Sequence, residues 1–495
     1  MTKSSPLWQK LKSNWHYWFF AIFLVALAAI LYTHLGRDYL FDWDEGIYGE
    51  LGRELLIRKN LFVSFWNGAV WFEKPPGIAW VSAIGIALTG PTALGARLLM
   101  PLFAIYTLYI VYRIGTHLGS WRHGLLAAGI LATLSLFLQR TRAVNTDMPL
   151  LAGITTTVLF LLENKPAWWV AAAVAGAVWF KGLDGFLAVI IAAPLFFPKS
   201  FRYIRNTIFY ILIFTLPWHL YALFAYGREF YQPYLLEQVI QRASTQIEFH
   251  FESRWYYLVY LYQNLGIGAL TVLSIGVASL LLRLRSKKPF FDTVRRNLFP
   301  ITLLWWLLMP LAVFTLAKTR LFWYILPIYP AIALVIAEAI ARWGESVAAH
   351  RVVTILAVGV AVQALFIASK SVEFGKASVP APDRIEVAME MSKLGSGELA
   401  VLVPPSEREA MAVLPTTARL SSSFRYGGMP AITYYYTAGT VRFFYNIDEF
   451  RAYLGAHDVN ALMATADEKY IPTGDRVVVT TPTYVGVRRA AYAHR

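Results

Sequence analysis

The chain contains no cysteine, and charged residues make up only 15% of its 495 residues. Without thiols it has no disulfide framework, no thiolate nucleophile and no cysteine-ligated zinc. Soluble domains carry about 25% charged residues, so the shortage of charge argues against a soluble protein. The sequence also lacks a Gly-rich phosphate-binding loop and a pair of histidines at helical spacing. Hydrophobic residues make up 57% of the total, which is typical of a polytopic membrane protein.

Basic residues outnumber acidic residues by 45 to 30, which gives a formal net charge of +15. This excess would suit a nucleic-acid-binding protein, but many of the basic residues lie in short runs between apolar segments. Such runs are typical of the cytoplasmic loops of membrane proteins. The strongest run extends from Arg283 to Arg296. We therefore interpret the charge as a signal of membrane orientation and expect no nucleic-acid partner.

The apolar segments predict a mainly α-helical protein with about 11–13 transmembrane helices in a domain over residues 1–369. Lysines before the first segment place its N-terminal side in the cytoplasm. The apolar run at 78–88 is short for a crossing of about 20 residues, and a full crossing would invert the charge pattern of the later loops. We expect it to be re-entrant or interfacial. The predicted spans lie at 15–35, 94–116, 124–141, 148–163, 167–181, 184–197, 204–225, 255–283, 298–316, 321–341 and 351–369.

The composition changes after about residue 370, where Ser, Pro, Gly and acidic residues return. Three β-branched or aromatic runs, at 399–403, 431–436 and 476–480, have the character of strands. Helix-like stretches at 384–394 and 448–454 separate them. This pattern predicts a small extracytoplasmic α/β domain over residues 370–495.

A charged motif follows the first apolar segment, in a predicted extracytoplasmic loop over residues 37–93 with interfacial helices. Asp42 and Glu45 have the spacing of a capping box, and an amphipathic pattern follows them. Asp44 would then lie in the first turn, near the positive end of a helix. Such carboxylates either cap the helix, which is the stronger alternative for Glu45, or take a proton from a reacting hydroxyl or bind a divalent cation.

Glu73 and Lys74 lie later in the same loop, directly before Pro75-Pro76. The two prolines restrict the backbone and so preorganise both side chains. A lysine held in this way is a good point charge for a phosphate. The alternative is an ordinary ion pair at the membrane interface.

Other charged residues lie at the ends of predicted spans, and each has a structural alternative. Asp147 is either a helix N-cap or a functional carboxylate, with neighbouring Arg142 as its partner or as a phosphate contact. Lys181 and the pair Lys318 and Arg320 are either snorkelling anchors or phosphate contacts. All of them fall on the predicted outer face.

Two further residues are candidates on the same face. Tyr324 either hydrogen-bonds a phosphate or belongs to an aromatic belt. His250 alternates with Glu248 and Glu252 as in an extended strand, which would place the three side chains together. They form either polar surface or a metal site shared with Glu73.

Together these motifs resemble the GT-C glycosyltransferases of the protein-mannosyltransferase and aminoarabinose-transferase superfamily, most closely the ArnT-like lipid A aminoarabinose transferases. The resemblance covers about residues 38–330 in the right order, and its first two motifs are the most specific. The matching pieces are Asp42-Trp-Asp-Glu-Gly-Ile-Tyr48, Phe72-Glu-Lys-Pro-Pro76, Arg142 to Pro149, Lys181-Gly182 and Lys318-Thr-Arg-Leu-Phe-Trp-Tyr-Ile-Leu-Pro327.

The resemblance implies a GT-C fold and an inverting sugar transfer from a polyprenyl-phosphate donor, undecaprenyl phosphate in bacteria, to a lipid or glycan such as lipid A. The absence of a Rossmann-type nucleotide-sugar domain agrees with a lipid-linked donor. A multi-pass protein of the bacterial inner membrane is implied, with membrane lipids around it and an active site facing the periplasm.

The resemblance also implies roles for single residues. Asp44 and Asp147 would be catalytic, with Asp44 as the base or positioner of the acceptor and Asp147 supporting the acceptor side. Lys181 and Glu45 are further site candidates. Glu73 would bind a divalent metal (zinc, magnesium or manganese), with His250 as its candidate partner. The candidates for the donor phosphate are Lys74, Arg242, Lys318, Arg320 and Tyr324.

One part of the chain departs from the family pattern. The family often has a Glu-His pair leading to an arginine, whereas this chain has Glu237-Gln238 leading to Arg242. The second ligand of a metal is therefore open. Two other functions also stay open: a protein O-mannosyltransferase-like enzyme, or a flippase of lipid-linked sugars, which would favour charged sites near mid-bilayer and inverted repeats.

Overall fold

The structure is a computed structural model that describes residues 14–247, 250, 252–284, 297–342, 347–374, 383–395, 397–413 and 423–488. The chain divides into two compact units. The first contains Met1–Thr33, Met100–His219 and Glu252–Gly375, and the second contains His34–Leu99, Leu220–Phe251 and Lys376–Arg495. The sequence predicts a domain boundary near residue 370. In the structure, residues 34–99 and 220–251 group with the C-terminal region.

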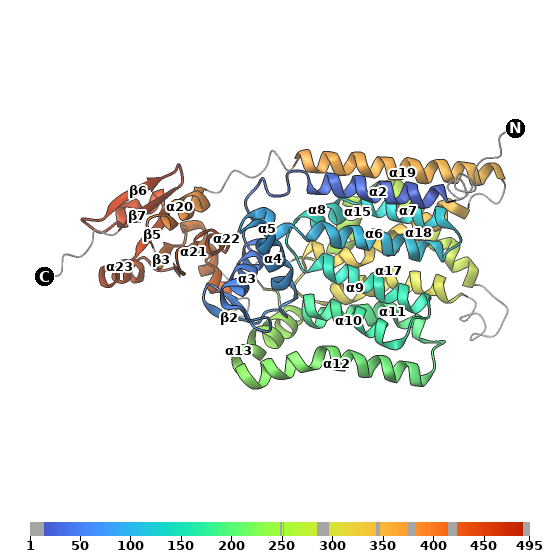
Figure 1. Ribbon diagram of the computed structural model, residues 1–495, viewed down its shortest axis with the longest axis horizontal. Helices are drawn as coiled ribbons and strands as arrows, with labels where there is room; N and C mark the ends of the chain where they lie inside the picture. The colour runs from blue at the N-terminus through green and yellow to red at the C-terminus, as the bar shows by residue number, and fades with distance from the viewer. Residues whose placement is uncertain are drawn as a thin grey trace. The chain divides into compact units, whose positions relative to one another are not determined.

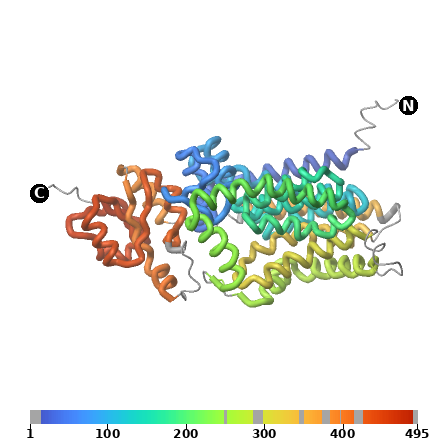
Figure 2. The backbone as a smooth tube through the Cα atoms, turned by 90° about the horizontal axis from the view of Figure 1, so that it is seen from below, coloured from blue at the N-terminus to red at the C-terminus, as the bar shows by residue number. Residues whose placement is uncertain are grey.

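The first unit is a bundle of apolar helices that run roughly parallel to one another (Figures 1 and 2). α2 and α19, from opposite ends of the unit's sequence, lie side by side. The helices are α2 (Trp15–Tyr32), α6 (Met100–Thr116), α7 (Trp121–Thr133), α8 (Ser135–Arg142), α9 (Asp147–Leu162), α10 (Ala167–Lys181), α11 (Leu187–Phe196), α12 (Phe201–Tyr226), α15 (Tyr256–Leu284), α17 (Leu298–Leu316), α18 (Tyr329–Arg342) and α19 (Val347–Phe374), with the 3-10 segments η1 (Gly182–Phe186) and η3 (Phe322–Ile328). The last turns of α12, from Leu220 on, group with the second unit.

Eight helical stretches of the described chain are long and apolar enough to cross a membrane, or nine if the pair α7–α8, bent by 72°, counts as one span. α9, predicted as a span, has only 16 residues. The stretch Ala167–Phe196 counts once, although α10 and α11 were predicted as two spans. The expected class, a mainly helical polytopic membrane protein with a small C-terminal sheet region, is confirmed.

The chain reverses direction between α10 and α11. Gly182 follows Lys181 with φ +64°, a left-handed conformation that favours glycine. A Cβ added to Gly185 would lie 2.4 Å from the backbone nitrogen of Val178, so η1 folds back against the end of α10. Gly185 and Val178 are seven positions apart, and in a straight helix they would be separated by about 10 Å. This reversal places Lys181 at a helix end.

The second unit begins with a helical and hairpin region. α3 (Asp44–Arg58) leads to the hairpin of β1 (Ser64–Trp66) and β2 (Ala69–Trp71), followed by α4 (Gly77–Thr89) and α5 (Ala93–Arg97). α4 packs against α3, and its 13 residues rise about 20 Å, less than the roughly 30 Å of a hydrocarbon core. That length agrees with an interfacial helix. Three further segments belong here: α13 (Arg228–Tyr231), the π-helical η2 (Gln232–Gln241) and α14 (Arg242–Ser244).

The C-terminal part of this unit contains a five-stranded sheet in the order β4-β3-β5-β7-β6. β3 pairs in parallel with β4 and β5, whereas β7 runs antiparallel to β5 and β6. The elements are α20 (Asp383–Ser392), β3 (Leu399–Leu402), α21 (Pro405–Val413), η6 (Ser423–Tyr426), α22 (Ala431–Tyr435), β4 (Val441–Phe444), α23 (Ile447–Ala456), β5 (Asn460–Ala464), η7 (Thr465–Tyr470), β6 (Arg476–Thr480) and β7 (Tyr484–Arg488).

Alternate residues of the strands face opposite sides, so the sheet has two apolar cores. Val401 and Leu462 pack with Met391 of α20, whereas Leu402 and Met463 pack with Phe450 of α23. The predicted strands at 399–403 and 476–480 and both predicted helices are present.

The strand expected at 431–436 is wrong, because Ala431–Tyr435 is the helix α22. Pro430 precedes this helix, and a Cβ added to Gly46 would lie 2.5 Å from the backbone nitrogen of Ala431, so only glycine fits there. The hydroxyl of Tyr435 accepts a hydrogen bond from the backbone N–H of Leu40 (2.9 Å). These contacts with the α3 region override the β propensity of the aromatic run.

Candidate active-site residues

Asp44 is the first residue of α3, as the sequence predicts, and its side chain is half-buried. The preceding residue, Trp43, has φ +69° and ψ −123°, which is rare for a residue with a side chain. Strain of this kind costs about 1–3 kcal/mol and persists where the surroundings impose it, often at functional sites. The turn is closed by hydrogen bonds from Gly46 N–H to Phe41 C=O (2.9 Å) and from Ile47 N–H to Trp43 C=O (2.8 Å).

Asp42 does not cap α3, so the predicted capping box is wrong. Its carboxylate accepts a hydrogen bond from the backbone N–H of Ala431 (3.1 Å) and forms an ion pair with Arg384. Burial raises the pKa of Asp42, and the charge of Arg384 opposes that shift. Asp42 therefore ties the start of the loop to the C-terminal region, because its partners lie more than 300 residues away.

Glu45 is buried and has a structural role. Its two carboxylate oxygens accept hydrogen bonds from Arg97 at 2.8 and 2.6 Å, and Oε2 also accepts one from the backbone N–H of Phe41 (3.0 Å). Arg97 in turn donates to the carbonyl oxygens of Leu35, Asp38 and Tyr39. This network fixes the approach to Asp44.

Glu73 lies between two hydrogen-bond donors. The Tyr426 hydroxyl donates to Oε1, and the Gln238 amide donates to Oε2 (2.8 Å). The indole N–H of Trp71 donates to the Tyr426 oxygen (2.6 Å). Lys74 is the next residue and is half-buried. Pro76 is the N-cap of α4, so the two prolines lie at the start of this helix, directly after Glu73 and Lys74.

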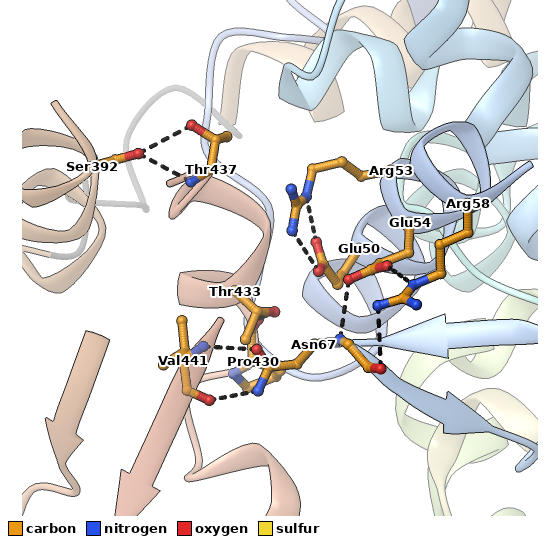
Figure 3. A network of polar contacts seen from close by, with 11 residues as sticks. Glu50, Arg53, Glu54, Arg58, Asn67, Ser392, Pro430, Thr433, Thr437 and Val441 are labelled. Atoms are coloured by element: carbon orange, nitrogen blue, oxygen red, sulfur yellow. Dashed lines mark hydrogen bonds and ion pairs between the residues drawn. The ribbon is translucent and has the colours of Figure 1, made fainter. Parts of the chain in front are cut away.

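Hydrogen bonds join α3 to the hairpin and the hairpin to the C-terminal sheet (Figure 3). Asn67 and Gly68 both have positive φ, +51° and +81°, as a tight hairpin turn requires. Glu54 accepts from the Gly68 N–H (3.0 Å), while the Asn67 side chain exchanges two hydrogen bonds with the backbone of Val441, at 2.5 and 2.7 Å. Burial raises the pKa of Glu50 to about 7, against the charge of Arg53.

The first unit contains a second polar cluster, centred on Asp147. This residue begins α9 and is only 4% exposed. Its Oδ2 accepts from Arg140 (2.7 Å), and its Oδ1 forms an ion pair with Lys181. The Asn145 side chain caps the helix by accepting from the backbone N–H groups of Asp147 (3.0 Å) and Met148 (2.9 Å).

Two aromatic rings of η3 cover the cations of this cluster. The guanidinium of Arg140 lies 5.1 Å from the ring centre of Trp323, and the Lys181 ammonium lies 4.9 Å from that of Tyr324. Both distances are within the range of cation–π attraction. The expected pairing of Asp147 with Arg142 is wrong, because Arg142 donates to the backbone carbonyls of Leu31 and Thr33.

The remaining candidates differ in their surroundings. Lys318 is exposed, whereas Arg320 is buried and donates to the carbonyls of Glu252 (2.7 Å) and Thr315 (2.8 Å). Arg242 begins α14 and is half-buried. Two of the five N–H donors of Arg320 are thus used on backbone carbonyls.

The candidate metal site at Glu73 and His250 stays a prediction. The backbone N–H of His250 donates to the carbonyl of Ile247 (2.9 Å). Glu248 lies outside the described residues. Among those that the structure describes, no group of three or more His, Asp or Glu side chains could hold a metal ion.

Several residues of these clusters were not found from the sequence. Arg140 stands seven positions before Asp147 and was visible as a second arginine beside Arg142. Gln238 was noted only as a departure from the family pattern. Tyr426 carried no signal, because 353 residues separate it from Glu73.

Comparison with known proteins identifies relatives of this chain. The family model described as dolichyl-phosphate-mannose-protein mannosyltransferase matches residues 73–221. An undecaprenyl phosphate-alpha-4-amino-4-deoxy-L-arabinose arabinosyl transferase of Sodalis glossinidius is 28% identical over 316 residues, 60% of this chain and 54% of that protein. A Pseudomonas aeruginosa protein of the same description is 25% identical over 351 residues, 66% of this chain and 61% of its own. The chain spans 54–63% of the length of three curated relatives that it matches, one of them an uncharacterized protein of Aquifex aeolicus.

Solved structures share the fold over nearly the whole chain. ArnT from Cupriavidus metallidurans, bound to undecaprenyl phosphate, has a TM-score of 0.71 at 17% identity and covers 97% of this chain and 99% of its own. The oligosaccharyltransferase of Archaeoglobus fulgidus has a TM-score of 0.53 at 12% identity, covering 92% of this chain and 70% of its own. The resemblance to GT-C, ArnT-like proteins that the motifs indicated is confirmed.

Proposed function

We propose that this protein is an inverting membrane glycosyltransferase that moves a sugar from a polyprenyl phosphate, undecaprenyl phosphate in bacteria, to a lipid or glycan acceptor such as lipid A. The observation that carries the proposal is the position of Asp44, which lies half-buried at the strained start of α3. A carboxylate that is partly exposed at such a position is suited to take a proton from an acceptor hydroxyl.

In the proposed reaction an acceptor hydroxyl oxygen attacks C1 of the donor sugar on the face opposite the phosphate. The new C1–O bond forms while the bond from C1 to the phosphate oxygen breaks, so the configuration at C1 inverts. The hydroxyl proton passes to Asp44, and the bonding electron pair leaves with the polyprenyl phosphate. One base and stabilisation of the phosphate suffice, without a covalent sugar–enzyme intermediate.

The leaving phosphate gains negative charge, which cationic residues would stabilise. Lys74 is the main candidate, because Pro75 and Pro76 restrict its backbone. Lys318, Tyr324 and Arg242 are the further candidates.

Asp147 and Arg320 act indirectly in this proposal. Asp147 positions Lys181 and Arg140 through its two ion pairs, and Arg320 holds its loop through two backbone carbonyls. Neither needs to touch the reacting atoms.

The relatives support a lipid-linked sugar donor, since their descriptions name undecaprenyl phosphate and a solved relative binds it. The alternative acceptor is a protein, because the description of the matched family model names transfer to protein. We place the enzyme in the bacterial inner membrane with its active site facing the periplasm. A flippase is less well supported, because the paired charges described above lie at helix ends.

The test is to incubate membranes containing the protein with labelled polyprenyl-phosphate sugars and to identify the labelled product by mass. Asp44→Asn and Lys74→Ala should each abolish transfer. Asp448→Asn is the matched control for the first, because Asp448 also lies in the first turn of a helix, α23. Lys393→Ala, at an exposed lysine, is the control for the second. Near-normal turnover in both active-site variants would contradict the mechanism, and a labelled protein would establish the rival acceptor.

A further inference from the structure

Successive connections of the C-terminal sheet leave β3 in opposite directions. From β3 the chain passes through α21 and α22 to β4, on one side of β3, and then through α23 to β5, on its other side. Residues of α22 pack in the core on one face of the sheet, and residues of α23 pack in the core on the other. The carboxyl ends of β3 and β5 therefore form a topological switch point. In open α/β sheets, ligands bind in the crevice at such a point.

An ion pair joins the two segments that follow these strands. α21 begins at Pro405, shortly after β3 ends, and η7 begins at Thr465, directly after β5. Arg408 of α21 donates from Nη2 to Oδ1 of Asp467 in η7 (3.2 Å). Both side chains are mostly buried, with 15% and 5% of their surface exposed. The pair thus bridges the carboxyl ends of two neighbouring parallel strands.

This ion pair is incomplete. An arginine and a carboxylate that meet side by side make two parallel hydrogen bonds of about 2.7–2.9 Å. Here only one bond forms, at 3.2 Å, and Nη1 of Arg408 and Oδ2 of Asp467 are buried with no hydrogen-bond partner in the described chain. The buried Oγ1 of Thr465, in the same 3-10 segment as Asp467, has none either. Three polar atoms at the switch point therefore lack a partner among the described residues.

Such atoms are costly to retain. A buried polar group without a partner costs about 1–3 kcal/mol, and native proteins keep such groups mainly where they serve a function. Another ion pair of the same sheet, between Arg442 and Glu398, closes at 2.7 Å. The open geometry therefore belongs to the switch point and is not a general property of this sheet.

The three atoms define the chemistry of a ligand. Nη1 of Arg408 donates, Oδ2 of Asp467 accepts, and the hydroxyl of Thr465 does both. A ligand hydroxyl also does both, so one such group can accept from Nη1 and donate to Oδ2. The charges of Arg408 and Asp467 balance, so the pair favours neither an anion nor a cation. Neighbouring hydroxyl groups of a neutral sugar match this set.

We propose that the carboxyl ends of β3 and β5 form a sugar-binding site, in which Arg408, Asp467 and Thr465 bind hydroxyl groups of a neutral sugar. Ala466 and Glu468, on either side of Asp467, are exposed, so the site lies close to the protein surface. The existence of the site does not depend on the proposed function. The source of its sugar does, because that function supplies two, the sugar of the donor and the glycan of the acceptor.

The first test measures binding and stability on the same variants. Methyl glycosides of glucose, galactose and N-acetylglucosamine are titrated into the full-length protein in lipid nanodiscs, which avoid the sugar head groups of maltoside detergents. Binding is followed by saturation-transfer difference NMR. Thr465→Val removes the hydroxyl at constant shape, so it should raise the Kd about threefold to tenfold while Tm stays unchanged or rises. Asp467→Asn should raise the Kd by about tenfold or more, because it loses a bond to a charged group.

Two control variants make the same chemical changes elsewhere in the sheet. Thr481→Val removes a hydroxyl that donates to the carbonyl of Tyr484 (2.9 Å), so it should lower Tm and leave the Kd unchanged. Glu398→Gln weakens the pair with Arg442 and should also leave the Kd unchanged.

Thr465→Val decides the outcome, including the case in which Asp467→Asn fails to fold. A wild-type Kd in Thr465→Val would overturn the inference and leave water as the only occupant of the site. Failure of the wild-type protein to bind any of the three glycosides would overturn it as well.

Transfer kinetics identify the source of the sugar. In Thr465→Val, a raised KM for the acceptor alone assigns the site to the acceptor glycan, and a raised KM for the polyprenyl-phosphate sugar alone assigns it to the donor. If the wild-type protein transfers no sugar, the proposed function fails. The binding test needs no transfer and still decides whether the site exists.

Discussion

Two neighbouring carboxylates, Asp44 and Glu45, should respond in opposite ways to the same isosteric change. Asp44→Asn removes a proton acceptor that is half-buried at the start of α3. General-base catalysis contributes about 10²–10⁴-fold in rate, so turnover should fall by that range. The free energy of unfolding of the Asp44→Asn variant should change by less than about 1 kcal/mol, because the substitution keeps the shape of the side chain.

Glu45→Gln should instead destabilise the protein. The side chains of Glu45 and Arg97 are only 4% and 6% exposed, and breaking a buried ion pair from one side costs about 3–5 kcal/mol. Arg97 keeps three backbone carbonyls as partners, so we expect about 3 kcal/mol, the lower end of this range. The residual activity of the folded fraction should exceed that of Asp44→Asn.

The assay combines thermal unfolding in detergent, followed by tryptophan fluorescence, with transfer from a labelled polyprenyl-phosphate sugar. The expected result is a clear fall in Tm for Glu45→Gln only and a loss of turnover at constant Tm for Asp44→Asn. The reasoning is refuted if Asp44→Asn keeps its turnover, or if Glu45→Gln melts at the wild-type temperature.

Three further predictions concern stability and topology. Asn67→Ala should destabilise the protein by about 2–4 kcal/mol, seen as a lower Tm, because it loses two hydrogen bonds to Val441 and places alanine at φ +51°. The raised pKa of Glu50 means that the folded state favours its protonated form, so stability is highest below the ordinary pKa of 4.5 and falls as the pH rises to about 7. In the Glu50→Gln variant, Tm should fall less between pH 4.5 and about 7 than in the wild-type protein. An equal fall in both proteins would contradict this prediction. Ser120→Cys in this cysteine-free chain should react with an impermeant thiol reagent only from the cytoplasm, and labelling from outside would show that the run at 78–88 crosses the membrane.

The start of the active-site loop was predictable because its signals are local. The apolar runs located the membrane helices, since length and hydropathy alone select segments that can cross a bilayer. The change from an apolar run to an amphipathic pattern placed Asp44 in the first turn of α3. The signal of Pro75-Pro76, which directly precede α4, is also local, because proline restricts its own backbone and that of its neighbour.

The partners of these residues depended on tertiary structure. Arg140 and Arg142 are equally charged neighbours of Asp147, and only the packing of α8 directs Arg140 to the carboxylate. The run at 431–436 has strand character, yet its contacts with the α3 region make it the helix α22.

For this protein, the sequence by itself determined the membrane class, the motif order and the resemblance to lipid-linked sugar transferases, because hydropathy and short motifs are properties of contiguous residues. Only the tertiary structure decided what surrounds Glu73. Trp71 is close in sequence, but Gln238 and Tyr426 are 165 and 353 residues away, and no local pattern encodes a hydrogen bond over such separations.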